Sequence, residues 1–191
     1  MTTAQTITRN KRERLIVAAK LAFYRQGFST TSLADVAALA EVPLGNVYYY
    51  FRTKDDLVST VIAAHLAEIR ARFAQWEQDP LPRQRLLSML QEERKGQDEL
   101  ARYGCPYGSL SIELGKDGTS LAPLAANLLE VQIDWAAQQF ALLGKEASEA
   151  RDLAVDLIAS LAGAFVLGCS LRSPALLDRQ LQRLQTWVES L

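Results

Sequence analysis

The side chains best suited to recognising another molecule gather in one short stretch, Gly45-Asn46-Val47-Tyr48-Tyr49. Asn46 can donate to and accept from base edges in the major groove of DNA, and Gly45 would let the backbone approach those edges closely. The hydroxyls of Tyr48 and Tyr49 are hydrogen-bond donors for phosphate oxygens, whose contacts fix the register of a protein on the duplex. The pattern therefore predicts recognition of DNA rather than catalysis.

Two short helices would hold this stretch in place. The segment from Ser32 to Phe51 reads SLADVAALAEVPLGNVYYYF, and its corner falls at Ala40-Glu41-Val42. Each predicted helix has a small apolar face, made by Leu33, Val36 and Ala37 in the first and by Val42, Val47 and Phe51 in the second. Two short helices at a steep angle, the second with small and hydrogen-bonding residues on its outer side, form a helix-turn-helix, which we expect at residues 32–51.

Further phosphate donors stand where helices are expected to begin. Thr31 and Ser32 precede the first helix of the pair, and Ser32 has Asp35 at the spacing of a capping box. Lys54 begins the next helix. Hydroxyls, lysines and helix N-termini supply affinity for phosphate that does not depend on sequence. The N-terminus is basic and either contacts the minor groove and backbone of DNA or is only a solvated tail. Its basic residues are Arg9, Lys11, Arg12 and Arg14.

Charge is distributed unevenly along the chain, although the formal net charge is only −1. Residues 1–54 hold eight Lys and Arg against three Asp and Glu, whereas residues 55–191 hold 13 against 19. A basic head on an acidic body is typical of a DNA-binding protein with a separate regulatory part, although surface charge can also vary by chance.

The remaining chain has the pattern of helices. Apolar residues at helical spacing, together with breaks at Asp79-Pro80-Leu81-Pro82 and Gly115-Lys116-Asp117-Gly118, predict helices over about 9–26, 54–77, 82–99, 120–143, 147–171 and 174–190, with a short one ending near Leu114. Strand-like alternation of useful length is missing from the sequence. We therefore expect an all-α fold, with a three-helix head that contains the helix-turn-helix and a C-terminal helical domain.

The string TTSLADVAALAEVPLGNVYYYFRTKDDL resembles the DNA-binding head of the TetR/AcrR family of bacterial transcriptional regulators. The likeness covers about residues 9–69, and the rest of the chain is similar to the family only in its helical plan. The resemblance implies phosphate contacts from Thr31, Ser32, Tyr48, Tyr49 and Lys54.

Three residues depart from the family pattern. Leu44 stands where a polar or basic residue is common, so it could contact a thymine methyl group but cannot read guanine. Glu41 replaces the glycine often found at the corner, and Pro43 removes a side-chain cap. These departures bear on the DNA sequence that is recognised rather than on the mode of binding.

The resemblance also implies how the chain would work. Residues 1–54 would form the DNA-binding head, and residues 55–191 an effector-binding and dimerisation domain. A homodimer would bind an inverted-repeat operator in double-stranded DNA, most often as a repressor, and a small-molecule effector would release it by moving the helix at about 54–77. The alternative is an all-α interaction protein whose basic head binds nucleic acid or protein non-specifically.

The last two predicted helices are candidates for the dimer interface. The segment from Leu157 to Gly168 is apolar or small on every side, which indicates burial on more than one side. Paired with the final helix, it predicts a four-helix interface formed by Leu161, Ala164, Phe165, Gly168, Leu177, Leu181, Leu184, Trp187 and Val188. A core helix in a monomer would show the same pattern.

The middle helices are expected to enclose the effector. Candidate residues are the aromatic Trp76, Tyr103, Tyr107, Trp135 and Phe140 and the polar Asp134 and Gln138, although aromatic side chains on helices commonly belong to the core. Cys105 is a further candidate, because it precedes Pro106 at an expected helix N-terminus, where the helix dipole favours a reactive thiolate. A small buried residue is the alternative for Cys105.

Other classes of function are poorly supported by the sequence. The single histidine, His65, leaves no partner for a His-rich metal site or an evident catalytic triad, so we expect no enzyme, cofactor or metal. The uncharged run from Leu157 to Leu171 is shorter than the roughly 18–20 residues of a membrane span, and no secretory signal precedes it. Two cysteines make no disulfide framework, and a reducing cytoplasm fits best.

Overall fold

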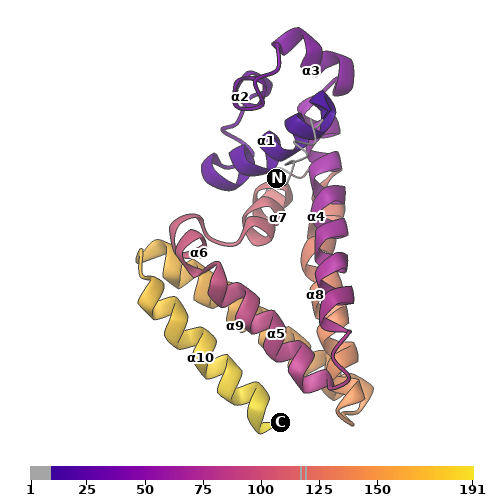
Figure 1. Ribbon diagram of the computed structural model, residues 1–191, viewed down its shortest axis with the longest axis vertical. Coiled ribbons are helices and arrows are strands. Elements are labelled where there is room, and N and C mark those ends of the chain that lie inside the picture. The colour runs from indigo at the N-terminus through magenta and orange to yellow at the C-terminus, as the bar shows by residue number, and fades with distance from the viewer. Residues whose placement is uncertain (1–9, 117, 119) are drawn as a thin grey trace, which may run out of the picture. The chain divides into compact units, whose positions relative to one another are not determined.

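The computed structural model describes residues 10–116, 118 and 120–191, so Arg9 and Asp117 lie outside the described residues. Within these ranges the ordered elements are helices (Figure 1). They are α1 (Lys11–Gln26), α2 (Leu33–Leu39), α3 (Leu44–Tyr50), α4 (Lys54–Trp76), α5 (Pro82–Lys95), α6 (Gln97–Tyr103), α7 (Pro106–Lys116), α8 (Ala122–Leu142), α9 (Ala147–Ser170) and α10 (Pro174–Ser190). The predicted all-α class is confirmed.

The chain forms two compact units, Met1–Ala63 and Ala64–Leu191. The division falls inside α4, so the first part of this helix belongs to the N-terminal unit and the rest to the C-terminal unit. We call the two units the head and the body.

The head is a three-helix core extended by the start of α4. Helix α1 begins at Asn10, whose side chain accepts a hydrogen bond from the backbone of Glu13, and it ends at Gly27 with φ of +91°. Its apolar side is buried against the other helices. The head core consists of Leu15, Ala18, Ala19, Ala22, Phe23, Phe28, Val36, Ala37, Ala40, Val42, Val47, Phe51, Leu57, Val58, Val61 and Ile62.

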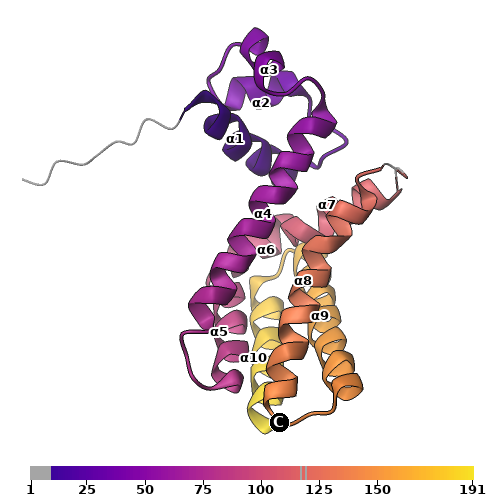
Figure 2. The same cartoon turned by 90° about the vertical axis from the view of Figure 1, so that its right-hand side faces the viewer.

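The body is a bundle in which α5, α8, α9 and α10 run side by side (Figure 2). The apolar spacing along α9 and α10 turns one side of each helix into the core, where Leu157, Leu177 and Leu181 are almost fully buried. One prediction here was wrong, because the single helix expected over about 82–99 is two helices, α5 and α6. Gly96 separates them with φ of −89° and ψ of 6°, and its lack of a side chain favours the break.

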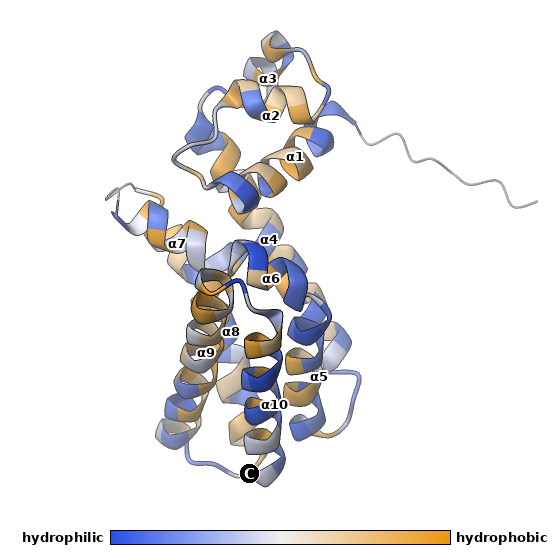
Figure 3. Cartoon of the chain, turned by 90° about the vertical axis from the view of Figure 1, so that its left-hand side faces the viewer, coloured by the Kyte–Doolittle hydropathy of each residue, from blue (hydrophilic) through white to orange (hydrophobic). Residues whose placement is uncertain are grey.

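Helix α9 is one of the two most apolar long helices of the body. By length and composition α9 could cross a membrane, because its most apolar window of 18 residues has a mean hydropathy of 1.9. The uncharged run from Leu157 to Leu171 is by itself shorter than a membrane span. Within the body α9 packs on α6, α8 and α10, and 39% of the 18-residue window is buried. A large part of its surface therefore stays both apolar and exposed, and Figure 3 shows apolar residues on its outer side towards the C-terminal end.

Candidate DNA interface, effector site and dimer face

Helix α3 presents the predicted base-reading residues on its outer side. Val47 is fully buried and Phe51 nearly so, which anchors α3 to the head core. Tyr49 is 83% exposed, and Tyr48 is 53% exposed on the same helix. A Cβ atom added at Gly45 would meet no atom of the chain within 4 Å, so packing inside the head does not require a glycine there. This face is free to meet an outside partner.

The remaining α3 residues have mixed surroundings. Leu44 is 40% exposed and Asn46 is half-buried. The ring of Tyr50 packs edge-to-face against that of Tyr49, with centroids 4.9 Å apart, so the pair is stiffened by its own contact.

The corner between α2 and α3 has an unusual backbone held by a side chain of α1. Glu41 has φ of +52°, in the left-handed region that glycine adopts more readily than other residues. The Nη2 atom of Arg14 donates to the backbone oxygens of Ala40 and Glu41, at 2.5 and 2.9 Å. The guanidinium therefore satisfies carbonyl groups that the end of α2 leaves without helical partners.

The two hydroxyl residues before α2 have separate roles. Ser32 is exposed and forms the predicted capping box, with its Oγ accepting from the backbone of Asp35 and its own N–H donating to the Asp35 carboxylate. Thr31, in contrast, is only 2% exposed, and its Oγ1 donates to the backbone oxygen of Gly27 at 2.7 Å. The prediction that Thr31 offers its hydroxyl to phosphate is therefore corrected, because that hydroxyl ties the loop to the end of α1.

Lys54 begins α4, as predicted, but its side chain lies back over the head. Its Nζ donates to the backbone oxygen of Ser29 at 3.3 Å and sits 4.1 Å from the centre of the Phe28 ring. The ammonium has three donors, so a phosphate contact requires either a remaining proton or a change of rotamer. Thr53 caps α4 through a hydrogen bond from the backbone of Asp56 to its Oγ1, at 3.0 Å.

In the body, a groove of about 320 Å³ lies between α4 and α8. Its lining consists of Arg70, Phe73, Ala74, Glu77, Val131, Asp134, Trp135 and Gln138. Three predicted effector residues, Asp134, Trp135 and Gln138, are therefore together. Stacking of Trp135 on Phe73, with ring centroids 4.7 Å apart, forms an aromatic wall. Asp134 is exposed and pairs with Arg151.

The other predicted effector residues lie in different parts of the body. Trp76 contacts Trp135, with ring centroids 5.3 Å apart. Phe140 is fully buried against Trp187 in the body core, so its side chain does not face the groove. Tyr103 lies at the end of α6, with the guanidinium of Arg102 over its ring. The predicted set is therefore not one pocket.

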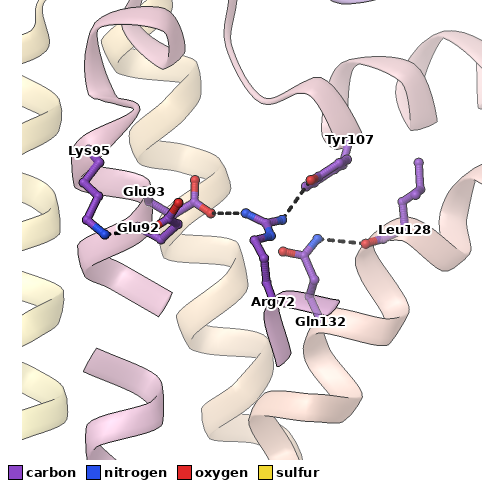
Figure 4. Close-up of polar contacts among 7 residues, drawn as sticks. All are labelled: Arg72, Glu92, Glu93, Lys95, Tyr107, Leu128 and Gln132. Atoms are coloured by element: carbon purple, nitrogen blue, oxygen red, sulfur yellow. Dashed lines mark hydrogen bonds and ion pairs between the residues drawn. The ribbon is translucent and has the colours of Figure 1, made fainter. Parts of the chain in front are cut away.

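A cluster of polar side chains surrounds Tyr107, which lies in the first turn of α7 (Figure 4). The Nη2 atom of Arg72 donates to Tyr107 Oη at 2.8 Å, and the Nη1 atom lies 3.8 Å from Oε1 of Glu93. Neither Arg72 nor Glu93 was predicted from the sequence as a functional residue. A signal was present, because Arg72 follows Ile69 and Glu93 follows Leu90 at the spacing of the buried apolar residues.

Cys105 belongs to this cluster and does not behave as a reactive thiolate. Burial raises the pKa of the Cys105 thiol to about 11, and the hydrogen bond that the backbone of Gly108 donates to Sγ opposes the rise only in part. The thiol therefore stays protonated at neutral pH. This shift, whose largest cause is loss of water, favours the alternative of a buried residue over an activated thiolate.

The predicted dimer residues need a correction. Leu161, Ala164, Phe165, Gly168, Leu177, Leu181 and Val188 are buried inside a single chain, and Leu184 and Trp187 are half-buried beside them. A Cβ atom added at Gly168 would come within 3.3 Å of Leu177, so the small residue serves the contact between α9 and α10 of one chain. The seven buried side chains are therefore covered within one chain, whereas Leu184 and Trp187 keep part of their surface exposed.

The opposite side of α9 remains uncovered. Exposed small and apolar residues follow one another at helical spacing, namely Val155, Ala159, Ala162, Gly163, Val166 and Leu167. We call this set the α9 stripe. An apolar stripe of this length on a soluble helix indicates a surface that another protein surface covers.

The fold and these surfaces define a class of protein: a helix-turn-helix head with an exposed recognition helix, joined to a helical body. Residues 15–61 match the family profile described as "Bacterial regulatory proteins, tetR family". This match assigns the N-terminal part of the chain to the DNA-binding domain of that family.

Individual relatives are also named as transcriptional regulators. The chain is 41% identical over 76 residues to the HTH-type transcriptional regulator TtgR of Pseudomonas putida, which is 37% of this chain and 35% of TtgR. The chain thus matches about a third of the length of that relative. It is 28% identical over 173 residues to the HTH-type transcriptional repressor DhaR of Mycobacterium sp. (strain GP1), covering 84% of this chain and 81% of DhaR.

Solved structures show the same fold over nearly the whole chain. A TetR transcriptional regulator from Legionella pneumophila superposes with a TM-score of 0.82 at 18% identity, covering 95% of this chain and 96% of that one. The reduced form of Escherichia coli NemR gives a TM-score of 0.79 at 22% identity, covering 92% and 95%.

Proposed function

We propose that the protein is a ligand-responsive transcriptional regulator that binds an inverted-repeat operator as a homodimer, and that it acts as a repressor in the cytoplasm. The observation that carries the proposal is the outer side of α3, where Gly45, Tyr48 and Tyr49 are exposed on a helix whose other side is fixed in the head core. A rigid helix with small and hydrogen-bonding groups on its outer side suits the major groove. Two relatives, DhaR and NemR, are named as repressors.

In this proposal the head residues divide into base and phosphate contacts. Gly45 and Asn46 would approach base edges, and Leu44 a thymine methyl group. Ser32, Tyr48 and Tyr49 would contact phosphates, and Lys54 would do so after leaving Ser29. Thr31 has a supporting role through its bond to Gly27.

The homodimer would form through the α9 stripe rather than through the residues first predicted. Ala159, Ala162 and Gly163 are small enough for a helix of a second copy to approach closely, and Val155, Val166 and Leu167 would lose water on contact. A two-fold arrangement places two recognition helices on successive half-sites of an inverted repeat.

Effector control would use α4, which continues without a break from Lys54 in the head to Trp76 in the body. A ligand that shifts the body part of α4 would change the spacing of the two heads and lower operator affinity. Linkage requires that effector and operator weaken each other's binding by the same factor.

The test compares Tyr49→Phe with Tyr50→Phe in operator binding, after selection of genomic fragments by the purified protein. Tyr49→Phe removes an exposed hydroxyl and should weaken binding about threefold to tenfold, whereas Tyr50→Phe should change it little. Equal binding by the wild type to every duplex of the same length would instead support a non-specific interaction protein.

A further inference from the structure

Polar side chains from four body helices converge on one half-buried position, which we call the Arg72 cluster (Figure 4). Arg72 comes from α4, Glu93 from α5, Tyr107 from α7 and Gln132 from α8. Gln132 is only 8% exposed, and its Nε2 donates to the backbone oxygen of Leu128 at 2.8 Å. The ring of His65, which is 7% exposed, packs edge-to-face on Tyr107 with centroids 5.2 Å apart.

Stability alone does not account for this arrangement. Charged and polar groups lose hydration when they are buried, and well-packed apolar residues at the same positions are commonly as stable or more so. The Arg72 contacts are also incomplete as an ion pair, because 3.8 Å between Nη1 and Glu93 Oε1 is too long for a hydrogen bond. A half-buried charged group that shares its surroundings with a second perturbed group is a candidate for a binding site.

We propose that the Arg72 cluster binds the effector and that the effector is a monocarboxylic acid with an apolar body. This inference rests on the proposed function, since it names the ligand class of the regulator. The carboxylate would lie between Nη1 of Arg72 and the hydroxyl of Tyr107. The planar guanidinium is the side chain best matched to a carboxylate, because its N–H groups fit two oxygens at once.

The hydroxyl of Tyr107 is prepared to donate. It accepts a hydrogen bond from Arg72 Nη2, so its own proton is directed to another acceptor. Burial raises the pKa of Tyr107 to about 12, which keeps the phenol protonated at neutral pH. Arg72 and Tyr107 together therefore offer a positive charge and a neutral donor to one oxyanion.

The charge of the cluster suits a monoanion. Burial raises the pKa of Glu93, so this carboxylate takes up a proton more readily than an exposed one. The charge of Arg72 opposes the rise. A ligand carboxylate would take the place of Glu93 beside Arg72, and one negative charge on the ligand would then match the positive charge of Arg72. A phosphate dianion would need a second cation.

The surroundings provide for an apolar body beside the carboxylate. The guanidinium carbon of Arg72 lies 5.8 Å from the ring centres of both Trp76 and Tyr107. Phe73, the next residue of α4, belongs to the partly buried side chains that pack on the body core. The apolar part of an aromatic or aliphatic acid would find the rings of Trp76 and Tyr107 beside Arg72.

The experiment titrates the full-length protein with benzoate, 3-phenylpropionate, hexanoate and decanoate, each beside its primary amide, by isothermal titration calorimetry at neutral pH. At least one acid should bind with a Kd below about 1 mM, and its amide should bind at least tenfold more weakly. Arg72→Gln should weaken the best acid about a hundredfold and Tyr107→Phe about tenfold. Glu93→Gln should retain or tighten binding, because it removes the competing carboxylate.

Arg70→Gln is the matched control, since Arg70 is exposed on the same helix and lines the groove between α4 and α8. It should leave acid binding unchanged. The proposal is overturned if no acid binds below that limit, if acids and amides bind alike, or if Arg70→Gln removes binding while Arg72→Gln does not. Operator binding without effector, measured on the same preparations, separates these outcomes from failure of the proposed function, because a DNA-binding regulator would still bind its operator.

Discussion

Arg14 donates a hydrogen bond from Nη2 to the backbone oxygen of Glu41, 2.9 Å away and 27 residues further along the chain. This contact joins α1 to the corner that sets the direction of α3. Arg14 was first considered as a possible contact to DNA, but its hydrogen bonds to Ala40 and Glu41 give it a place inside the head. It therefore positions the recognition helix.

Replacing Arg14 by methionine should lower the free energy of unfolding by about 1–2 kcal/mol, because two carbonyl groups lose a charged donor. Operator affinity should fall as well, while the slope of its logarithm against the logarithm of salt concentration stays the same. A phosphate contact would reduce that slope by about 0.9 instead. Lys11→Met, at an exposed position of the same helix, is the control for loss of charge.

Glu41→Gly should stabilise the head by about 0.5–1 kcal/mol, since φ of +52° costs a side-chain-bearing residue more than glycine. Urea denaturation measures the change. Glu13→Gly makes the same replacement within α1 and should be destabilising. If both substitutions were destabilising, the corner backbone would not be strained by its glutamate.

The free energy of unfolding of Glu93→Gln, relative to that of the wild type, should increase as the pH rises. Burial raises the folded-state pKa of Glu93, so its contribution is fully present below its unfolded pKa of about 4.5 and is lost as the pH rises through the folded value. The measurement is the unfolding free energy of both proteins from pH 4 to pH 8. The charged and titratable groups that interact with Glu93 are the same in both proteins and include Arg72, Glu92, Cys105 and Tyr107. Glu68 and His65 interact with Tyr107 and are also unchanged. A difference that does not change with pH would contradict the burial of this carboxyl.

Val166→Asp should convert the homodimer to monomers, because it places a charge within the α9 stripe, towards its C-terminal end. Analytical ultracentrifugation gives the mass of the particle. Ile112→Asp, which replaces an exposed apolar residue of α7, is the matched control and should leave the dimer intact. Dimers in both variants would place the interface elsewhere.

Much of the fold follows from apolar spacing in the sequence. Leu57, Val61, Ile62 and Leu66 recur at helical intervals and are buried in α4, whose course over about 54–77 was predicted. Helix ends were also readable where the cap is local, as at Ser32 with Asp35. The break at Gly96 was not, since a single glycine inside an apolar pattern is tolerated in many helices.

The sites were harder to predict because they depend on which side of a helix meets another helix. Along α9 the apolar pattern includes both Leu161, which is buried within one chain, and Val166, which is exposed. Spacing alone does not tell a core face from an interface. Thr31 and Lys54 were recognised as possible donors, but their bonds to Gly27 and Ser29 depend on how the loop folds back on α1.

Footprinting of the purified protein on the genomic fragment that it binds best tests the central claim most directly. A dimeric regulator predicts protection of an inverted repeat, with half-sites centred about one helical turn of DNA, or a whole number of turns, apart. Asn46→Ala should remove this protection while leaving the helical circular dichroism unchanged. Protection that is diffuse, falls steeply with salt and does not respond to Asn46→Ala would contradict sequence-specific regulation and leave only a basic head that binds DNA without choice.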